Sequence, residues 1–397
     1  MMKSQSQVLS ARWVVPVTSE PIHGGWVQIE DGKVVAIGSG SPPGPSKDLG
    51  DVAVLPGLVN AHTHLEFSDC SETIGIPGIS LPEWIGQVVS TRQASDQIGR
   101  SQAINSGLEE LAHTGSCLVG EITTLPCEYP VDTCGVDLVS FAEVLGLSSE
   151  RGTERLKLAT THLGLDPGSG VSPHAPYSTS LETLDACLQL ANTKHRVLAM
   201  HVAESPYERE LLQAGTGPFA EALQSLGVWR DNLFPWSENP FLMLIEKLAQ
   251  APRSLLIHAN DLNESEITKL AKFPQMTVVY CPRTHYFFEY GPHPVAEMLS
   301  RGVRVALGTD SKASNPDLNL WSEAQFLWRH RVDIDPQAIL QMATWSGSEA
   351  LGRSDLGCIR PGSLAKMGLV RSSASTVDGL FNDFATSGYE PLWKFAD

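Results

Sequence analysis

Two histidines with one residue between them, His62 and His64, follow an apolar run at residues 52–55. On an extended strand, side chains two residues apart point to the same side, so both imidazoles can face one ion while Thr63 points away. Imidazole is a common ligand of zinc and of iron. Two structural histidines at this spacing fit the pattern equally well, so the interpretation depends on the rest of the chain.

Three further apolar runs also end in residues that bind metals or move protons. These residues are His201, Glu204, His258 and Asp310. The carboxyl ends of all strands in a parallel α/β barrel open on one face, where active sites lie, so distant residues can converge. Taken singly, each has a structural interpretation: a strand-end histidine can be hydrogen-bonded structure, Asp310 can cap a helix, and Glu204 can complement a helix dipole. Their joint placement at successive strand ends favours one metal site.

The elements that must position these residues alternate between apolar runs and amphipathic segments. Strands alternating with helices indicate a parallel sheet, and eight units indicate closure into a barrel. The predicted strands are 52–64, 116–121, 136–143, 170–173, 197–201, 255–258, 277–280 and 303–308. The predicted helices include 103–113, 181–194, 207–226, 265–273, 295–301, 318–328 and 336–342.

Both ends of the chain have strand character instead. Short β-rich runs at 8–17, 25–29 and 33–38 are separated by turn residues, and Asp31-Gly32 between two of them predicts a hairpin. The tail at 357–370 returns to the same character. We therefore expect a small β-sandwich domain from residues 1–57 and 358–397, beside a barrel over residues 58–357.

Composition excludes several classes of function. The net charge of −17 opposes binding to nucleic acid, and no apolar stretch approaches the ~20 residues that span a bilayer. Residues 1–6 lack a hydrophobic signal region, so a cytoplasmic protein is expected. The seven cysteines contain no Cys-x-x-Cys pair, which predicts reduced thiols and no thiolate zinc site.

Five segments, in order along nearly the whole chain, resemble the amidohydrolase superfamily. They are residues 56–64, 172–178, 201–204, 257–260 and 302–311. The branch they resemble contains aminohydrolases and chlorohydrolases related to cytosine, guanine and S-adenosylhomocysteine deaminases. The resemblance implies a distorted (β/α)8 TIM barrel with a β-sandwich from the two termini. It also implies one divalent metal ion, zinc or iron, with the ligands His62, His64, His201 and Asp310.

The number of metal ions and the chemistry follow from the same resemblance. Two-metal relatives carry a bridging lysine, and the predicted fourth strand offers Ser172-Pro173-His174 instead, which agrees with a single ion. The resemblance implies that Asp310 takes a proton from water, that His258 orients that water, and that Glu204 protonates a ring nitrogen before ammonia leaves. Glu204 is the reason to prefer deamination over dehalogenation.

The substrate is indicated by segments around the first strand and the seventh. Residues 64–68, 81–84 and 281–285 resemble deaminases of 6-aminodeoxyfutalosine, an adenine nucleoside with a benzoate-containing arm that is used in one menaquinone route. The substrate contacts implied are Glu66, Trp84, His174, Arg283 and Ser311. Arg92 is a second candidate for the carboxylate, although it is most simply a solvated helix residue, and Trp84 is equally compatible with packing at the barrel mouth.

Several alternatives stay open from the sequence. The substrate is a small molecule, and S-adenosylhomocysteine, methylthioadenosine or another heterocycle would suit the same residues. A cyclic amide or a chloro-heterocycle would need the same hydroxide. A non-catalytic barrel is disfavoured because no ligand position is lost. A homodimer is a family-level expectation. Lys366 replaces an acid that many relatives carry, and the insertion at 229–239 either shapes the pocket mouth or forms a surface loop.

Overall fold

The computed structural model describes residues 6–93, 97–130, 132–235 and 238–393. Its centre is a sheet of eight parallel strands in the order β13-β12-β11-β10-β9-β8-β7-β6. The strands are β6 (Leu58–Thr63), β7 (Ser116–Thr123), β8 (Asp137–Val144), β9 (Gly170–Pro173), β10 (Val197–Val202), β11 (Arg253–His258), β12 (Met276–Tyr280) and β13 (Arg304–Leu307). A parallel bridge between Thr63 and Asp310 joins the two outermost strands, so the sheet closes into a barrel.

Helices lie between and after the barrel strands. The first are η1 (Leu65–Phe67), α1 (Leu81–Gln93), α2 (Gln97–Thr114), α3 (Ser149–Leu165), α4 (Leu181–Lys194), α5 (Pro206–Ala214), α6 (Pro218–Ser225) and α7 (Pro240–Leu248). The later ones are α8 (Glu264–Leu270), α9 (Pro282–Phe287), α10 (Val295–Ser300), α11 (Leu320–His330), α12 (Pro336–Met342), α13 (Trp345–Ala350) and α14 (Val377–Phe384). The predicted alternation of strands and helices is confirmed.

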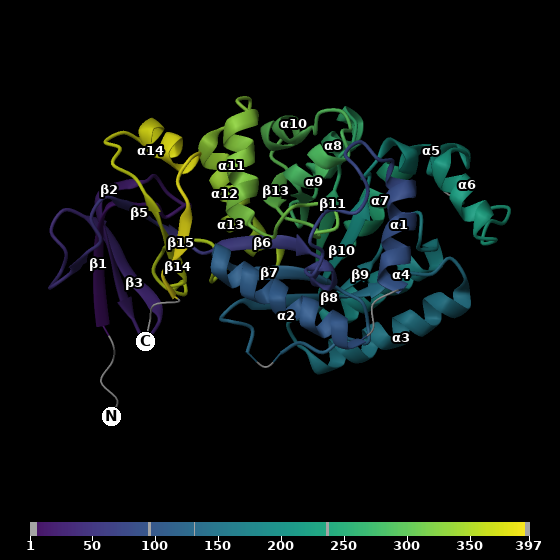
Figure 1. The fold of residues 1–397 in the computed structure, drawn as a ribbon, viewed down its shortest axis with the longest axis horizontal. Coiled ribbons are helices and arrows are strands. Elements are labelled where there is room, and N and C mark those ends of the chain that lie inside the picture. Colours follow the sequence, from purple (N-terminus) through teal and green to yellow (C-terminus); the bar gives the residue numbers. More distant parts are fainter. Residues whose placement is uncertain (1–5, 94–96, 131, 236–237, 394–397) are drawn as a thin grey trace.

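A second sheet combines both ends of the chain. Its order is β15-β14-β5-β1-β2-β3, with β4 paired to β1. The strands are β1 (Ser6–Val14), β2 (Ile22–Glu30), β3 (Lys33–Ser39), β4 (Lys47–Asp48), β5 (Val52–Pro56), β14 (Met367–Arg371) and β15 (Tyr389–Pro391). Figure 1 shows these purple and yellow segments together on one side of the barrel. The predicted barrel with a smaller β unit from both termini is thus confirmed.

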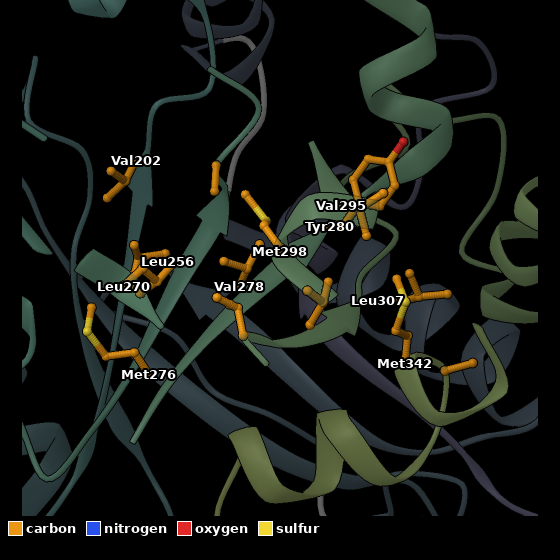
Figure 2. Packing of buried hydrophobic residues seen from close by; sticks show 14 of the residues in the cluster. Val202, Leu256, Leu270, Met276, Val278, Tyr280, Val295, Met298, Leu307 and Met342 are labelled. Atoms are coloured by element: carbon orange, nitrogen blue, oxygen red, sulfur yellow. The ribbon is translucent and has the colours of Figure 1, made fainter. Parts of the chain in front are cut away.

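Nearly every side chain of the barrel strands is buried, and successive side chains join two different apolar clusters. Leu255 and Ile257 belong to an apolar cluster with small residues of neighbouring strands, whereas Leu256 packs with helix residues such as Leu270. Figure 2 shows part of this second cluster, in which side chains of β10 to β13 lie with side chains of α8, α10 and α12. Helix α13 contacts β6, β11, β12 and β13. Packing on the outer face and against α13 holds the strands in place.

Two segments that we predict as single elements are interrupted by glycine. The strand expected over 52–64 divides at Gly57, where an added Cβ would lie 2.5 Å from the Cys117 sulfur, so β5 joins the second sheet and β6 the barrel. The helix expected over 207–226 divides into α5 and α6, because Gly215 and Gly217 have φ of +66° and +84°. The expected domain boundaries, at 57/58 and 357/358, stay a proposal.

Lys366 joins the two sheets electrostatically. Its Nζ donates to the Gly135 carbonyl at 2.7 Å and lies 2.8 Å from Asp137 Oδ1 at the start of β8. Arg353 Nη2 lies 2.7 Å from the other oxygen of Asp137. A lysine at this position therefore meets a carboxylate from the barrel.

Three remaining sequence features find a place in the fold. Trp229 and Phe234 of the insertion pack on an apolar cluster that includes Tyr177 and Phe219, while positions 236 and 237 lie outside the described residues. No disulfide joins any of the seven cysteines, all of which are described. Among the described helices, none combines the length and apolarity needed to cross a bilayer.

Candidate metal centre and active site

Four side chains from the ends of β6, β10 and β13 meet at one point. His62 Nε2 lies 3.4 Å and His64 Nε2 lies 3.7 Å from Asp310 Oδ1. His64 Nε2 lies 3.3 Å from His201 Nε2. Ligand atoms of His62, His64 and Asp310 all fall within 4.8 Å of one another, so the three could hold one cation. The structure therefore brings the four predicted ligands together.

The state of the imidazoles suits a cation. Burial, and then the neighbouring His201, lower the pKa of His62 well below its ordinary value, and burial lowers the pKa of His201 to about 4. Both rings are thus neutral near pH 7 and can donate a lone pair. Neither nitrogen of His62 has a hydrogen-bond partner among the described residues, although the side chain is fully buried. A buried group without a partner is costly, and a bound metal ion would supply the missing partner.

The ring of His201 is oriented from the neighbouring strand. His201 Nδ1 donates to the carbonyl of His174 at 2.8 Å, which leaves Nε2 with its lone pair toward His64. Metal-binding histidines commonly donate their second nitrogen to such an acceptor, which fixes tautomer and ring orientation. The donor set of three imidazoles and one carboxylate therefore fits a divalent ion such as zinc or iron.

His258 and Glu204 border the cluster on the side of β10 and β11. The His258 ring centroid lies 5.7 Å from that of His62, and His258 Nε2 lies 3.5 Å from Glu204 Oε1. Strict alternation along β11 would turn His258 outward with Leu256, but His258 has a φ of +70°. This backbone conformation, rare outside glycine, breaks the alternation at the strand end. His258 can therefore reach the barrel opening.

Left-handed backbone recurs at these strand ends. Ala203, Ala259 and Asp310 have φ of +53°, +55° and +57°. Such conformations cost free energy in residues other than glycine, and they are concentrated at functional sites when the surrounding structure holds them. Here Ala203 and Ala259 lie next to Glu204 and His258 in the chain, and Asp310 is itself a residue of the predicted site.

The sequence agrees with this architecture over most of its length. A model of the amidohydrolase family matches residues 53–387. The chain belongs to the amidohydrolase family. It is thus a hydrolase that acts on C–N bonds, in agreement with the deaminases among its relatives.

Two curated relatives and one solved structure show what this amidohydrolase resembles. 5-Methylthioadenosine/S-adenosylhomocysteine deaminase of Nitratidesulfovibrio vulgaris is 28% identical over 399 residues, 93% of this chain and 85% of the relative. Aminodeoxyfutalosine deaminase of Deinococcus radiodurans is 28% identical over 334 residues, 78% and 76% of the two chains. The crystal structure of Helicobacter pylori aminofutalosine deaminase with methylthio-coformycin has a TM-score of 0.84 at 20% identity and 97% coverage of both chains, a likeness of fold.

A polar group of residues borders the cluster of candidate metal ligands of this amidohydrolase on the side of β6 to β9. Arg92 Nη2 lies 2.7 Å from Glu66 Oε1 and 3.8 Å from Glu143 Oε2. The Thr124 hydroxyl lies 3.0 Å from Glu66 Oε1 and 3.3 Å from Glu143 Oε2, so it can donate to either carboxylate. His174 Nε2 lies 4.0 Å from Glu143 Oε1, and its ring centroid lies 5.0 Å from that of His201. The predicted contacts Glu66 and His174 thus lie beside the cluster.

The other three predicted substrate contacts have different surroundings. Trp84 donates to the carbonyl of Ala313 at 3.4 Å and packs edge-on against Phe288, so packing already accounts for it. Ser311 is buried directly after Asp310. Arg283 lies 2.7 Å from Glu323 and 2.6 Å from Asp317, so its charge is already compensated. These ion pairs argue against Arg283 as the anchor of a substrate carboxylate.

Two buried supports of the site escape prediction from sequence. Glu121 on β7 accepts from the Thr63 hydroxyl at 2.6 Å and from the Leu65 N–H at 3.0 Å, which braces the end of β6. Asn60 donates to the Thr309 hydroxyl at 2.8 Å and accepts from the Thr309 N–H at 3.1 Å. An acid inside an otherwise apolar run is a weak signal, and the partners become visible only after the barrel closes.

We expect Asn60→Ala to lower the free energy of unfolding by about 2 kcal/mol, because it removes the two buried hydrogen bonds that join the Asn60 side chain to Thr309. Urea titration measures the change in unfolding free energy. The content of bound metal shows whether Asp310, the proposed ligand that follows Thr309, is still in place. The exposed Asn105→Ala is the control and should stay within about 0.5 kcal/mol of the wild type. Equal losses in both variants would show that the bridge between β6 and β13 contributes little.

Proposed function

We propose that this amidohydrolase is a metal-dependent deaminase of an adenine-type nucleoside, with 6-aminodeoxyfutalosine as the preferred substrate and a place in a menaquinone route. The observation that carries the proposal is the position of Glu204. Its carboxyl lies 3.5 Å from His258 beside three imidazoles and Asp310, and burial, then the charge of Asp310, raise its pKa well above the ordinary value. A carboxyl with a raised pKa is suited to give a proton to a ring nitrogen.

The ligands of the ion, in this proposal, are His62, His64, His201 and Asp310, and the ion is zinc or iron. When bound, a divalent cation lowers the pKa of its water, so that hydroxide is available near neutral pH. The nearby backbone supports this role of Asp310, because the N–H groups of Thr309 and Asp310 donate to the His62 carbonyl and tie the two ligand strands together.

The remaining steps belong to the side chains of the chain itself. Asp310 accepts a proton from the attacking water, and His258 orients that water through its ring. Glu204 protonates the ring nitrogen next to the carbon that carries the amino group. A second proton then reaches the amino group, the C–N bond breaks, and ammonia leaves while the carbon keeps the oxygen of water. Glu66, Trp84, His174 and Ser311 would contact the rest of the nucleoside.

A second nucleoside is favoured by a specific observation. The arm of 6-aminodeoxyfutalosine carries a carboxylate, which would need a positively charged partner. Arg283, however, is already paired with Asp317 and Glu323, and Arg92 lies near Glu66 and Glu143. The relative that matches 93% of this chain is a deaminase of 5-methylthioadenosine and S-adenosylhomocysteine. We therefore keep these two compounds as the alternative substrates, with a chloro-heterocycle or a cyclic amide as the reaction outside deamination.

The test is ammonia release by metal-loaded protein given 6-aminodeoxyfutalosine, adenosine, 5-methylthioadenosine and S-adenosylhomocysteine in parallel. We expect the highest kcat/KM with the first compound. Activity on the others alone would keep the nucleoside deaminase and remove the menaquinone assignment. No ammonia from any of the four, with one metal ion bound per chain, would contradict the proposed function. Oligomeric state, expected to be a homodimer, is measured separately by light scattering.

Arg92→Met separates the two substrate classes. If Arg92 contacts the carboxylate of the arm, its loss should lower kcat/KM for 6-aminodeoxyfutalosine by about 10- to 100-fold, the value of a hydrogen bond to a charged group. The kcat/KM for 5-methylthioadenosine, which has no carboxylate, should change little. Arg283→Lys is the comparison and should leave the ratio of the two values unchanged. If Arg283→Lys changed that ratio and Arg92→Met did not, Arg283 rather than Arg92 would be the residue that binds the carboxylate of the arm.

A further inference from the structure

A second glutamate lies beneath the proposed proton donor, and the chemistry above does not use it. Glu208, in the first turn of α5, is fully buried. One of its oxygens accepts from the Ala203 N–H at 2.8 Å and the other from the Glu204 N–H at 3.1 Å. The adjacent Arg209 pairs instead with Asp261 and Glu266. Burying a polar group costs free energy unless it is hydrogen-bonded, and both oxygens of Glu208 are used on the backbone of residues 203 and 204.

The backbone that Glu208 holds is a strained turn. Ala203 has a φ of +53°, in the left-handed region that residues other than glycine rarely adopt. Its carbonyl accepts from the Asp261 N–H at 2.9 Å, and the Glu204 carbonyl accepts from Asn260 Nδ2 at 2.9 Å. Both residues are thus held on their N–H side by Glu208 and on their carbonyl side by the segment that follows β11.

This turn decides where the proton donor lies. β10 ends at Val202, and the left-handed residue redirects the chain so that the Glu204 carboxyl lies 3.5 Å from His258 rather than continuing along the strand. Without the two acceptor oxygens of Glu208, Ala203 would lose the contact that compensates its strain. The chain would then relax toward an ordinary extended conformation, and Glu204 would move.

We propose that Glu208 is a positioning residue, which holds the left-handed turn at Ala203 and thereby aims the Glu204 carboxyl at the reacting ring nitrogen. The inference rests on the proposed function, because Glu204 is the proton donor only in a deaminase. The hydrogen bonds of the Glu208 carboxyl go to the backbone of Ala203 and Glu204 rather than to the proposed metal ligands. Its loss should therefore affect the chemical step and not the binding of substrate or metal.

Glu208→Gln tests the inference with little change of volume. The amide keeps one acceptor oxygen but turns an NH2 group toward the second backbone N–H, so one of the two hydrogen bonds is lost. We expect kcat to fall about 100-fold, the effect of displacing a reacting group by about 1 Å. The KM and the metal content should stay at their wild-type values. If the glutamine variant does not fold, Glu208→Asp, which keeps both oxygens on a shorter chain, should show the same split with a smaller loss.

The matched control is Glu266→Gln. Glu266 is also a buried acid in the first turn of the helix after a barrel strand, and it accepts from the Asn263 N–H at 2.8 Å. The backbone it holds lies five residues beyond His258, so kcat should change little. If Glu208 acted only by complementing the helix dipole, kcat would fall equally in Glu208→Gln and Glu266→Gln. Equal kcat in Glu208→Gln and the wild type, or equal losses in both variants, would overturn the inference.

Two further measurements separate this inference from the proposed function. Glu208→Gln should slow the Glu204→Gln enzyme no further, because both changes remove the same proton transfer, and an additive loss would contradict us. A crystal structure of Glu208→Gln should show Ala203 outside the left-handed region and Glu204 displaced from His258. An unchanged turn would overturn the inference even if the wild type released no ammonia, a result that by itself would contradict only the deaminase.

Discussion

Glu204→Gln should reduce kcat for ammonia release by about 10²–10⁴-fold, the usual contribution of general acid–base catalysis, while one metal ion per chain stays bound. The glutamine side chain preserves shape but has no proton to give to the ring nitrogen. The KM should change little, because the hydrogen-bonding outline of the site is retained. Steady-state kinetics and metal analysis of the same preparation measure both effects.

The control for this variant is Glu210→Gln. Glu210 lies on the exposed side of α5, six residues beyond the proposed proton donor Glu204, and its substitution should leave kcat unchanged. If Glu204→Gln loses its metal, Glu204 is a ligand and not a proton shuttle. If it retains both metal and full activity, another group supplies the proton and the mechanism proposed above is wrong.

Removal of the metal should abolish activity and destabilise the fold. Chelation leaves the buried His62 nitrogens without the partner that an ion supplies. Ligand linkage predicts a loss of about 4 kcal/mol relative to protein held at a free metal concentration 1,000 times the Kd. Activity and unfolding free energy should both return when zinc or iron(II) is added, and comparison of the two ions identifies the better one.

His62→Asn should reproduce the effect of chelation without a chelator. It removes a proposed ligand, so the bound metal and the activity should fall together and added metal should not restore them. His330→Asn, on the exposed end of α11, is the control and should retain both. Full metal content in His62→Asn would remove this residue from the ligand set and leave its buried nitrogens to be explained in another way.

Periodicity explains why so much of the barrel could be predicted. Strands buried on both faces produce the apolar runs at 197–201 and 255–258, and the helices between them produce amphipathic segments, so local patterns report the alternation directly. β9 and α12 have the predicted bounds. The sequence does not predict the breaks at Gly57 and at Gly215 to Gly217, because the backbone conformation of a glycine depends on neighbours that only the fold supplies.

The sequence alone therefore determined the fold class and the set of residues that could bind a metal, since strand ends and residue types are local properties. Only the tertiary structure decided which charges are free. The ion pairs of Arg283 with Glu323 and Asp317 join residues 34 to 40 positions apart, and no local pattern reveals them. The same holds for the left-handed turn at Ala203, which Glu208 supports from the next helix. Hydrogen bonds and burial depend on the closed barrel, and these decide how each side chain of the site can act.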